Sequence, residues 1–253
     1  MWPEILIVLP LAFFSGAINA AVGGGGLIAV PALFATFPDM PPASLLGSDK
    51  ASAVFGHVGA MRQYALRMAL PWRLIGFASA AAFCGALLGA LAVHAFPPQM
   101  IRPVVVVLLA AMFVYTALRP NFGHDVEPLP LSPRRLAAGL AIGFVIGLYD
   151  GFFGPGTGSF LVFLFVRMFR FDFLRATACA KVVNLASNCG ALVFFVPAGA
   201  VIWSLAIPLG LSAWLGGLVG ARVVMMGGNL WLRRIFLILS ASLLLKLVWE
   251  AVR

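Results

Sequence analysis

Ten apolar runs follow one another along this chain, separated only by short stretches of charge, proline or glycine. They occupy residues 3–22, 24–37, 44–66, 72–96, 100–118, 134–153, 155–169, 174–196, 202–226 and 231–249. Most of them approach the length of about 20 residues at which an α-helix crosses a bilayer. Since 62% of the residues are hydrophobic and 10% are charged, a soluble fold could not cover its core with polar surface. The sequence therefore predicts an all-α polytopic membrane protein with about 8 to 10 membrane segments.

The first five runs recur in the last five at an offset of 131 residues, without a gap. Charged and aromatic residues match at this offset, in the pairs Lys50 and Lys181, Trp72 and Trp203, and Arg102 and Arg233. The motifs Gly85-x-x-x-Gly89 and Gly216-x-x-x-Gly220 also match, and they predict close helix packing. We interpret the chain as an internal duplication. The predicted boundaries are a first membrane repeat over 1–119, a linker over 120–133 and a second membrane repeat over 134–253.

Loop charges indicate that the two repeats, of about five segments each, are inverted relative to each other. Three arginines follow the third run of the first repeat, and the equivalent loop at 197–202 has no charge. The charge bias reverses in the loops that precede the third runs. The loop at 37–43 has no basic residue, whereas its counterpart in the second repeat has three. The arginines are, in chain order, Arg62, Arg67, Arg73, Arg167, Arg170 and Arg175. Lys and Arg accumulate in cytoplasmic loops, so this pattern predicts a periplasmic N-terminus and a cytoplasmic linker.

A glycine-rich break precedes the short second run of each repeat, and that run either crosses the membrane or is re-entrant. The first break follows Asn19, and the second follows Asp150. A broken helix inside a bilayer exposes backbone N–H groups, which together with the helix dipole favour an anion. Close packing by small residues is the alternative, and we favour an anion site because the two breaks match. The candidate ligands are Gly23, Gly24, Gly25, Gly26, Gly154, Gly156, Thr157, Gly158 and Ser159.

The third runs contain the strongest polar signal, because each carries a lysine within an apolar helix. Lys50 and Lys181 are equivalent, and Asn184 and Asn188 lie on the same helical face as Lys181. A lysine in the membrane is costly and usually faces a cavity or a partner. Snorkelling to the interface is the alternative. Two matched lysines near a common axis would attract an anion, so we predict that these four residues bind the substrate.

Three titratable residues near the lysines are candidates for carrying a coupling proton: Asp49, His57 and Asp150. Either aspartate could instead be a structural partner for a lysine, and His57 could be a hydrogen-bonded packing residue. Sodium is the alternative coupling ion. The residues by themselves leave these roles open.

Other classes of function fit the sequence less well. An intramembrane enzyme would need Ser48, Asp49 and His57 together, but nine residues of helix separate Ser48 from His57 by roughly 13 Å. A cation transporter using Asp49 and Asp150 conflicts with the positive charge of the proposed cavity. No Gly-Lys-Ser/Thr ending, no His-x-x-x-His spacing and no clustered basic patch occurs. We therefore expect no cofactor, metal or nucleic acid, and the expected partners are the bilayer, a small anion and a coupling ion.

Several of these motifs resemble the signatures of the sulfite exporter TauE/SafE family, and of its YfcA-like branch in particular. The stretches GAINAAVGGGGLIAVPAL, YDGFFGPGTGSFL and ATACAKVVNLASN carry the resemblance, which extends over nearly the whole chain. The resemblance implies a duplicated helical bundle in the bacterial inner membrane that carries sulfite, a sulfonate or a related organosulfur anion. It assigns the second glycine signature to Asp150, Gly151, Gly154, Pro155, Gly156, Thr157 and Gly158.

The chain departs from the YfcA-like pattern at two positions. Such members tend to have Asp before the first glycine cluster and Asn before the first lysine, whereas this chain has Asn19 and Asp49 there. An acid is thus relocated within the predicted site. We predict a permease that works by alternating access between inverted repeats, with transport direction and oligomeric state left open.

Overall fold

The computed structural model describes residues 2–65, 68–118 and 130–226, together with residues 238, 241–243, 245 and 249. Over these residues the chain is helical between its turns and contains no β-strand, so the predicted all-α class is confirmed. The helices are α1 (Trp2–Val22), α2 (Gly26–Thr36), α3 (Pro42–Ala65), α4 (Trp72–Ala95), α5 (Pro98–Leu118), α6 (Pro133–Phe152), α7 (Thr157–Phe169), α8 (Phe173–Phe195) and α9 (Trp203–Met225). Most of the linker and of the run at 231–249 lies outside the described residues.

Five helices are long and apolar enough to cross a membrane: α1, α4, α6, α8 and α9. With 24 residues, α3 is as long as α4, but it carries Asp49, Lys50 and Arg62. The short helices α2 and α7 have 11 and 13 residues. At about 1.5 Å per residue, neither reaches across a bilayer core of about 30 Å. On length, the two helices that follow the glycine breaks therefore cover only part of a membrane.

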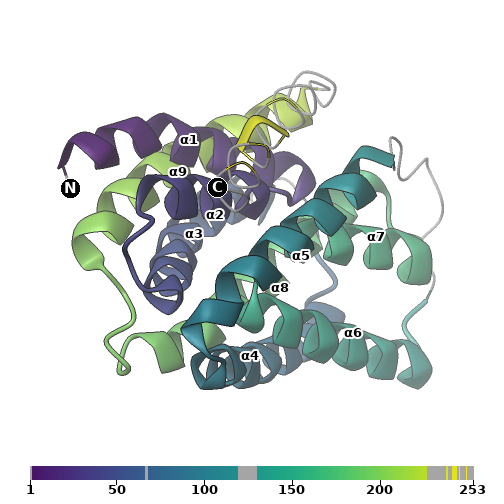
Figure 1. Cartoon of the computed structure of the whole chain (residues 1–253). Helices are drawn as coiled ribbons and strands as arrows, with labels where there is room; N and C mark the ends of the chain where they lie inside the picture. Colours follow the sequence, from purple (N-terminus) through teal and green to yellow (C-terminus); the bar gives the residue numbers. More distant parts are fainter. Residues whose placement is uncertain are drawn as a thin grey trace.

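The helix boundaries follow the offset found in the sequence. Trp72 and Trp203 begin α4 and α9, and Gly26 and Thr157 begin α2 and α7. The packing follows the same rule, because α1 packs along α9 while α6, the counterpart of α1, packs along α4 (Figure 1). Each repeat thus completes its helix pairs with a helix of the other repeat, as an internal duplication would predict.

Close approach between these helices depends on glycines at matched positions. Gly85 and Gly89 of α4 lie against the backbone of α6, and Gly216 and Gly220 of α9 lie against the backbone of α1. A Cβ atom at any of the four positions would overlap a backbone carbonyl oxygen of the neighbouring helix. The close packing predicted from the two Gly-x-x-x-Gly motifs is confirmed.

The helices α3 and α8 are equivalent in the two repeats and run antiparallel to each other. Near the start of α3, the Ser48 hydroxyl accepts a hydrogen bond of 2.9 Å from the N–H of Ile202, which follows α8. At the start of α8, Arg175 donates over 3.4 Å to the carbonyl oxygen of Ala69, which follows α3. The beginning of each helix therefore lies beside the end of the other.

The antiparallel arrangement sorts the loops by charge. The end where α3 finishes and α8 begins carries several described arginines, among them Arg62, Arg73, Arg167, Arg170 and Arg175. At the opposite end, the loops 37–41 and 196–202 carry neither Lys nor Arg. The positive-inside rule assigns the arginine-rich end to the cytoplasm, and this sidedness stays a prediction. Arg67, which the sequence analysis counted in the same loop, lies outside the described residues.

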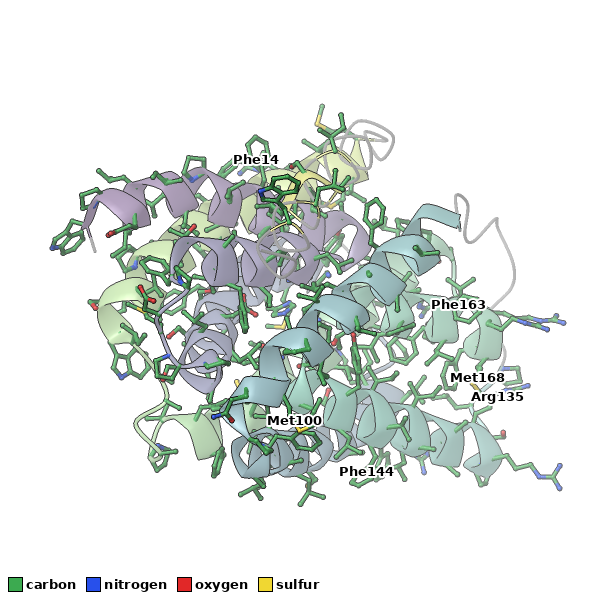
Figure 2. The ribbon with its side chains drawn as sticks, in the orientation of Figure 1. Phe14, Met100, Arg135, Phe144, Phe163 and Met168 are labelled. Carbon is green, nitrogen blue, oxygen red and sulfur yellow. The ribbon has the colours of Figure 1, made fainter. Side chains whose placement is uncertain are left out.

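Large apolar side chains cover the outside of the helical bundle (Figure 2). Phe144 and Met100, both labelled there, are 40% and 53% exposed. The interior is apolar as well, since Ile18, Phe165 and Phe195 are fully buried. An apolar exterior around an apolar core is typical of a protein surrounded by lipid.

We expect Gly85→Ala to destabilise the protein, because the added Cβ would have to displace the backbone of Phe144 in α6. Overpacking of this kind costs about 1–3 kcal/mol. Gly76→Ala is the matched control, since a Cβ at this exposed position of the same helix meets no heavy atom within 4 Å. Thermal unfolding in detergent should show a lower midpoint for Gly85→Ala alone. Equal midpoints would contradict the packing described above.

Candidate functional site

The two glycine breaks meet in the interior. Gly23 (φ +81°), Gly154 (φ +100°) and Gly156 (φ +85°) adopt left-handed conformations that few side chains tolerate. The first turns the chain from α1 into α2, and the other two turn it from α6 into α7. A Cβ on Gly23 would overlap the backbone of Gly158 and Ser159. The structure thus brings candidate residues of both breaks to one place.

Some polar groups of the breaks are already bonded within the protein. The N–H of Gly23 donates to the carbonyl oxygen of Asn19 (3.0 Å), and the N–H of Thr157 donates to that of Gly154 (3.1 Å). The Thr157 hydroxyl lies 2.9 Å from Asp150 Oδ1 and 2.6 Å from the Gly154 carbonyl oxygen. Thr157, which we predicted as a donor to the substrate, therefore serves the protein's own oxygen atoms in this conformation.

The middle glycines of the first break also bond within the protein. The carbonyl oxygen of Gly24 accepts from the N–H of Leu27 (3.0 Å). The carbonyl oxygen of Gly25 accepts from the Ser15 hydroxyl (2.9 Å) and from the N–H of Ile28 (2.9 Å). These contacts tie the start of α2 to α1 and hold the turn in place.

Four side-chain donors hold the Asp150 carboxylate at the end of α6. Lys50 of α3 forms an ion pair with Oδ1 (2.7 Å), and the Thr157 hydroxyl donates to the same oxygen. Oδ2 accepts from the Ser187 hydroxyl (2.5 Å) and from the Asn188 amide (3.2 Å), both on α8. Charge-assisted hydrogen bonds of this kind compensate the cost of burying a carboxylate. Asp150, which is 2% exposed, is thus an internal anion that neutralises Lys50.

Lys181, the equivalent of Lys50, contacts Asn19, the equivalent of Asp150. Its ammonium group donates to the backbone carbonyl oxygen of Asn19 and lies 3.4 Å from Asn19 Oδ1. Lys181 is fully buried, and no described carboxylate forms an ion pair with it. Because an asparagine side chain carries no charge, the positive charge of Lys181 lacks a bonded counter-charge. A buried charge of this kind indicates a functional site.

Three of the four side chains that hold Asp150 have no residue of the same type at the equivalent position, the exception being Lys50. The equivalent pairs are Gly26 and Thr157, Gly56 and Ser187, and His57 and Asn188. The half of the site around Asn19 therefore lacks one carboxylate and two hydroxyl groups. His57 lies there with its ring 3.4 Å from the Asn19 amide nitrogen. One half of the site thus contains a carboxylate of the protein itself, whereas the other half has the Asn19 amide at the equivalent position.

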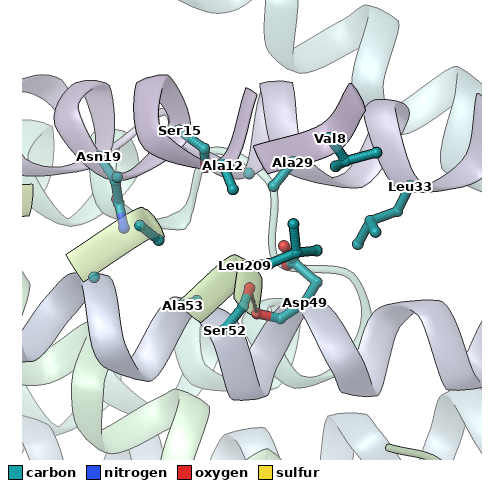
Figure 3. Close-up of a pocket in the computed structure, with 14 residues that line it drawn as sticks. Val8, Ala12, Ser15, Asn19, Ala29, Leu33, Asp49, Ser52, Ala53 and Leu209 are labelled. Carbon is teal, nitrogen blue, oxygen red and sulfur yellow. Dashed lines mark hydrogen bonds between the residues drawn. The ribbon is translucent and has the colours of Figure 1, made fainter. Parts of the chain in front are cut away.

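Two small cavities adjoin Asn19, and Gly26, Asp49 and Ala53 line both of them. The first has a volume of about 40 Å³ and extends among apolar residues of α1, α2 and α9, with Ser15 and Ser52 in its wall (Figure 3). The second has a volume of about 30 Å³. Its further lining residues are Gly23, Lys50, His57, Asp150, Gly154, Gly156, Asn184 and Asn188. Since water occupies about 30 Å³ per molecule, each cavity has room for about one.

Asp49 of α3 lines both cavities and is 7% exposed. Its side chain forms no hydrogen bond or ion pair with any described residue, while its backbone carbonyl oxygen accepts from Ser52 (2.9 Å). Lys50 is the next residue but binds Asp150. Ala180 stands at the position equivalent to Asp49. Among the described residues, Asp49 is thus a carboxylate at the centre without a partner, and the equivalent position of the second repeat has no carboxylate.

Ser187 is not among the residues predicted from the sequence, and the sequence did not indicate which lysine has a counter-charge. Ser187 lies three residues after Asn184 and one before Asn188, so its place in the polar stretch NLASN was an available signal. It donates to the Asn184 carbonyl oxygen (2.9 Å) as well as to Asp150. Lys181 contacts Asn19, but it is not among the described residues that line either cavity.

The structure brings together no catalytic set around Ser48. The Ser48 hydroxyl donates to the carbonyl oxygen of Ser44 (2.7 Å) and accepts from the N–H of Ile202, whereas His57 contacts Asn19. Across the described ranges, no group of three or more His, Cys, Asp and Glu side chains could hold a metal ion.

Comparisons with known proteins point to membrane transporters. The model of the sulfite exporter TauE/SafE family matches residues 8–247. A protein of Sinorhizobium sp, "Probable membrane transporter protein ORF9", is 36% identical over 243 residues, which cover 94% of this chain and 89% of that protein. "Probable membrane transporter protein YfcA" of Escherichia coli K12 is 33% identical over 243 residues, which cover 95% and 88%. A "Probable membrane transporter protein" of Haemophilus influenzae is 32% identical over 246 residues, which cover 97% and 95%. No solved structure matches the chain.

We expect Lys50→Met to destabilise the fold, because it leaves the buried Asp150 carboxylate without its counter-charge. Removing one partner of a buried ion pair costs about 3–5 kcal/mol. The double variant Lys50→Met/Asp150→Asn removes both charges and should regain most of that loss. Thermal unfolding in detergent measures both effects. A double variant as unstable as the single one would mean that the two residues do not act as a pair.

Proposed function

This chain belongs to the sulfite exporter TauE/SafE family, and on that basis we propose that it is a secondary permease for a small anion. Sulfite, a sulfonate or a related organosulfur anion is the proposed cargo. Its relatives are named as membrane transporters, and its long apolar helices suit a multi-pass membrane protein. The proposed location is the bacterial inner membrane, with the N-terminus in the periplasm.

The observation that carries the proposal is that Lys181 is buried without a bonded counter-charge among the described residues. Its ammonium group is fully buried, is held by Asn19, and has no carboxylate partner among the described residues. It lies where two broken helices meet, and helix N-termini favour negative charge. An anion bound there would replace the missing counter-charge. The same feature argues against a cation as cargo, since Lys50 and Lys181 both extend into this region.

We place the cargo in the half of the site around Asn19, Lys181 and His57. The equivalent half already contains a carboxylate, that of Asp150, bonded to Lys50 and three other donors. A substrate anion there would have to displace the Asp150 carboxylate, which is part of the chain and cannot leave the site. The chain therefore carries one anion at a time, and Asn184 and Asn188 shape the wall between the two halves.

Transport requires a change of shape around this site. Cavities of about 40 and 30 Å³ have room for about one water molecule of about 30 Å³ each, so the centre would have to widen to hold the proposed cargo. Repeats of opposite orientation can exchange conformations, which would open the site first to one side and then to the other. Alternating access of this kind is the mechanism that we propose.

We expect Lys181→Met to lower anion transport at least about 10-fold, which corresponds to about 1.4 kcal/mol of lost interaction. The measurement is flux of radiolabelled sulfite and of a radiolabelled sulfonate into proteoliposomes, with a radiolabelled divalent cation as a negative probe. Because the variant removes a buried ammonium group that forms no ion pair with a described residue, its unfolding midpoint should be no lower than that of the wild type.

The matched control is Lys50→Met/Asp150→Asn, which removes the other central lysine together with its counter-charge. This variant should retain most of the anion flux, because the net charge of the centre is unchanged. A normal anion flux in Lys181→Met would contradict the proposed anion site. Flux of the divalent cation without anion flux would favour a cation transporter instead.

A further inference from the structure

We propose that Asp49 binds the proton that couples anion transport to the proton gradient, so that one proton and one monovalent anion cross the membrane together. The inference rests on the proposed function, to which it adds the coupling ion and the residue that carries it. Its starting point is a buried carboxylate that the fold leaves without a partner.

Asp49 is more than nine-tenths buried, at 7% exposed, and it lines both central cavities. Figure 3 shows Asp49 and Ser52 of α3 on one side of the first cavity and Ser15 and Asn19 of α1 on the other. No described residue forms a hydrogen bond or an ion pair with the Asp49 side chain. Burying an unpaired carboxylate is costly, so a group in this place is expected to bind and release a cation.

The charged and titratable groups near Asp49 come from three helices. Its own helix, α3, contributes Lys50 and His57, and α6 contributes Asp150. Lys181 of α8 contacts Asn19, which lines both cavities together with Asp49. The parts of α1, α2 and α9 that line the first cavity contribute no titratable side chain. Lys50 and Asp150 neutralise each other, and a proton on His57 would add a third positive charge beside two lysines. The charge balance of the centre therefore depends on Asp49 and Lys181.

Two of the four loading states leave this centre neutral. In the empty protein, the Asp49 carboxylate balances the Lys181 ammonium. In the fully loaded protein, Asp49 is protonated and the bound anion balances Lys181. Anion alone or proton alone leaves one net charge in a low-dielectric interior, where an uncompensated charge is most costly. Only the two neutral states convert readily between the outward-facing and the inward-facing conformation. The proton and the anion therefore cross the membrane together.

A proton fits the first cavity better than sodium does. A metal cation needs several oxygen ligands, but most residues in this wall are apolar. The hydroxyls of Ser15 and Ser52 already donate to the carbonyl oxygens of Gly25 and Asp49. A proton needs only the Asp49 carboxylate itself.

Asp150 is less suited than Asp49 to carrying the coupling proton. Protonating the Asp150 carboxylate would disrupt its bonds with Lys50, Thr157, Ser187 and Asn188. The position equivalent to Asp49 in the second repeat is occupied by Ala180. The proposed proton-binding carboxylate therefore occurs once per chain, which accounts for one proton per anion.

The test compares wild type and Asp49→Asn as full-length chains in proteoliposomes, with radiolabelled methanesulfonate as the monovalent anion. Asparagine imitates the protonated side chain without exchanging a proton. In the wild type, an inward proton gradient should speed uptake at least about 5-fold. In Asp49→Asn, exchange of external for internal anion at equal pH should stay within about 2-fold of the wild type, while the response to the gradient is lost.

Asp39→Asn, which removes an exposed carboxylate in the loop 37–41, is the matched control and should keep both activities. Asp49→Glu retains a carboxyl group and should keep the gradient response if Asp49→Asn fails to fold. The inference is overturned if folded Asp49→Asn still responds to the proton gradient, if it loses exchange as well, or if a sodium gradient drives the wild type instead. If the wild type exchanges no anion at all, the proposed function fails first.

Discussion

Each central lysine reaches across the molecule to the glycine break of the other repeat. Lys50 of the first repeat binds Asp150 at the end of α6, and Lys181 of the second binds Asn19 near the end of α1. A buried ammonium group is tolerated only where such partners satisfy it. The positions of α3 and α8 are therefore tied to both breaks, and the glycine contacts between α1 and α9 and between α4 and α6 close the bundle around them.

The two half-sites are built from residues that match at an offset of 131 positions, but the side chains make them unequal. One half holds a tethered carboxylate with a complete set of donors, while the other has an amide at that position and glycines in place of two hydroxyl-bearing residues. A symmetric pair of helices thus carries an asymmetric charge distribution. Because the interior has a low dielectric constant, a difference of one charge between the halves is large in free energy. This asymmetry is the basis of both the anion site and the coupling that we propose.

The fold class and the ends of the helices could be predicted from the sequence, because they depend on local properties. Runs of apolar residues need helices, since a bilayer offers no hydrogen bonds to the backbone. The two glycine-rich breaks mark where α1 ends before α2 and where α6 ends before α7. The matched Gly-x-x-x-Gly motifs indicated close packing correctly, although not which helices they join. The sidedness of the loops rests on charge counts and stays a prediction.

The sequence by itself determined a helical membrane bundle with duplicated segments, two breaks, and lysines at equivalent places. Only the tertiary structure decided which lysine has a counter-charge, that Thr157 and Ser187 serve Asp150, and that Asp49 has no partner. The decisive contacts join residues 100 and 162 positions apart in the chain. Spacing along a helix fixes only which face a side chain occupies. Which group it meets depends on how separate helices pack, because a hydrogen bond requires a donor and an acceptor to come within about 3 Å of each other.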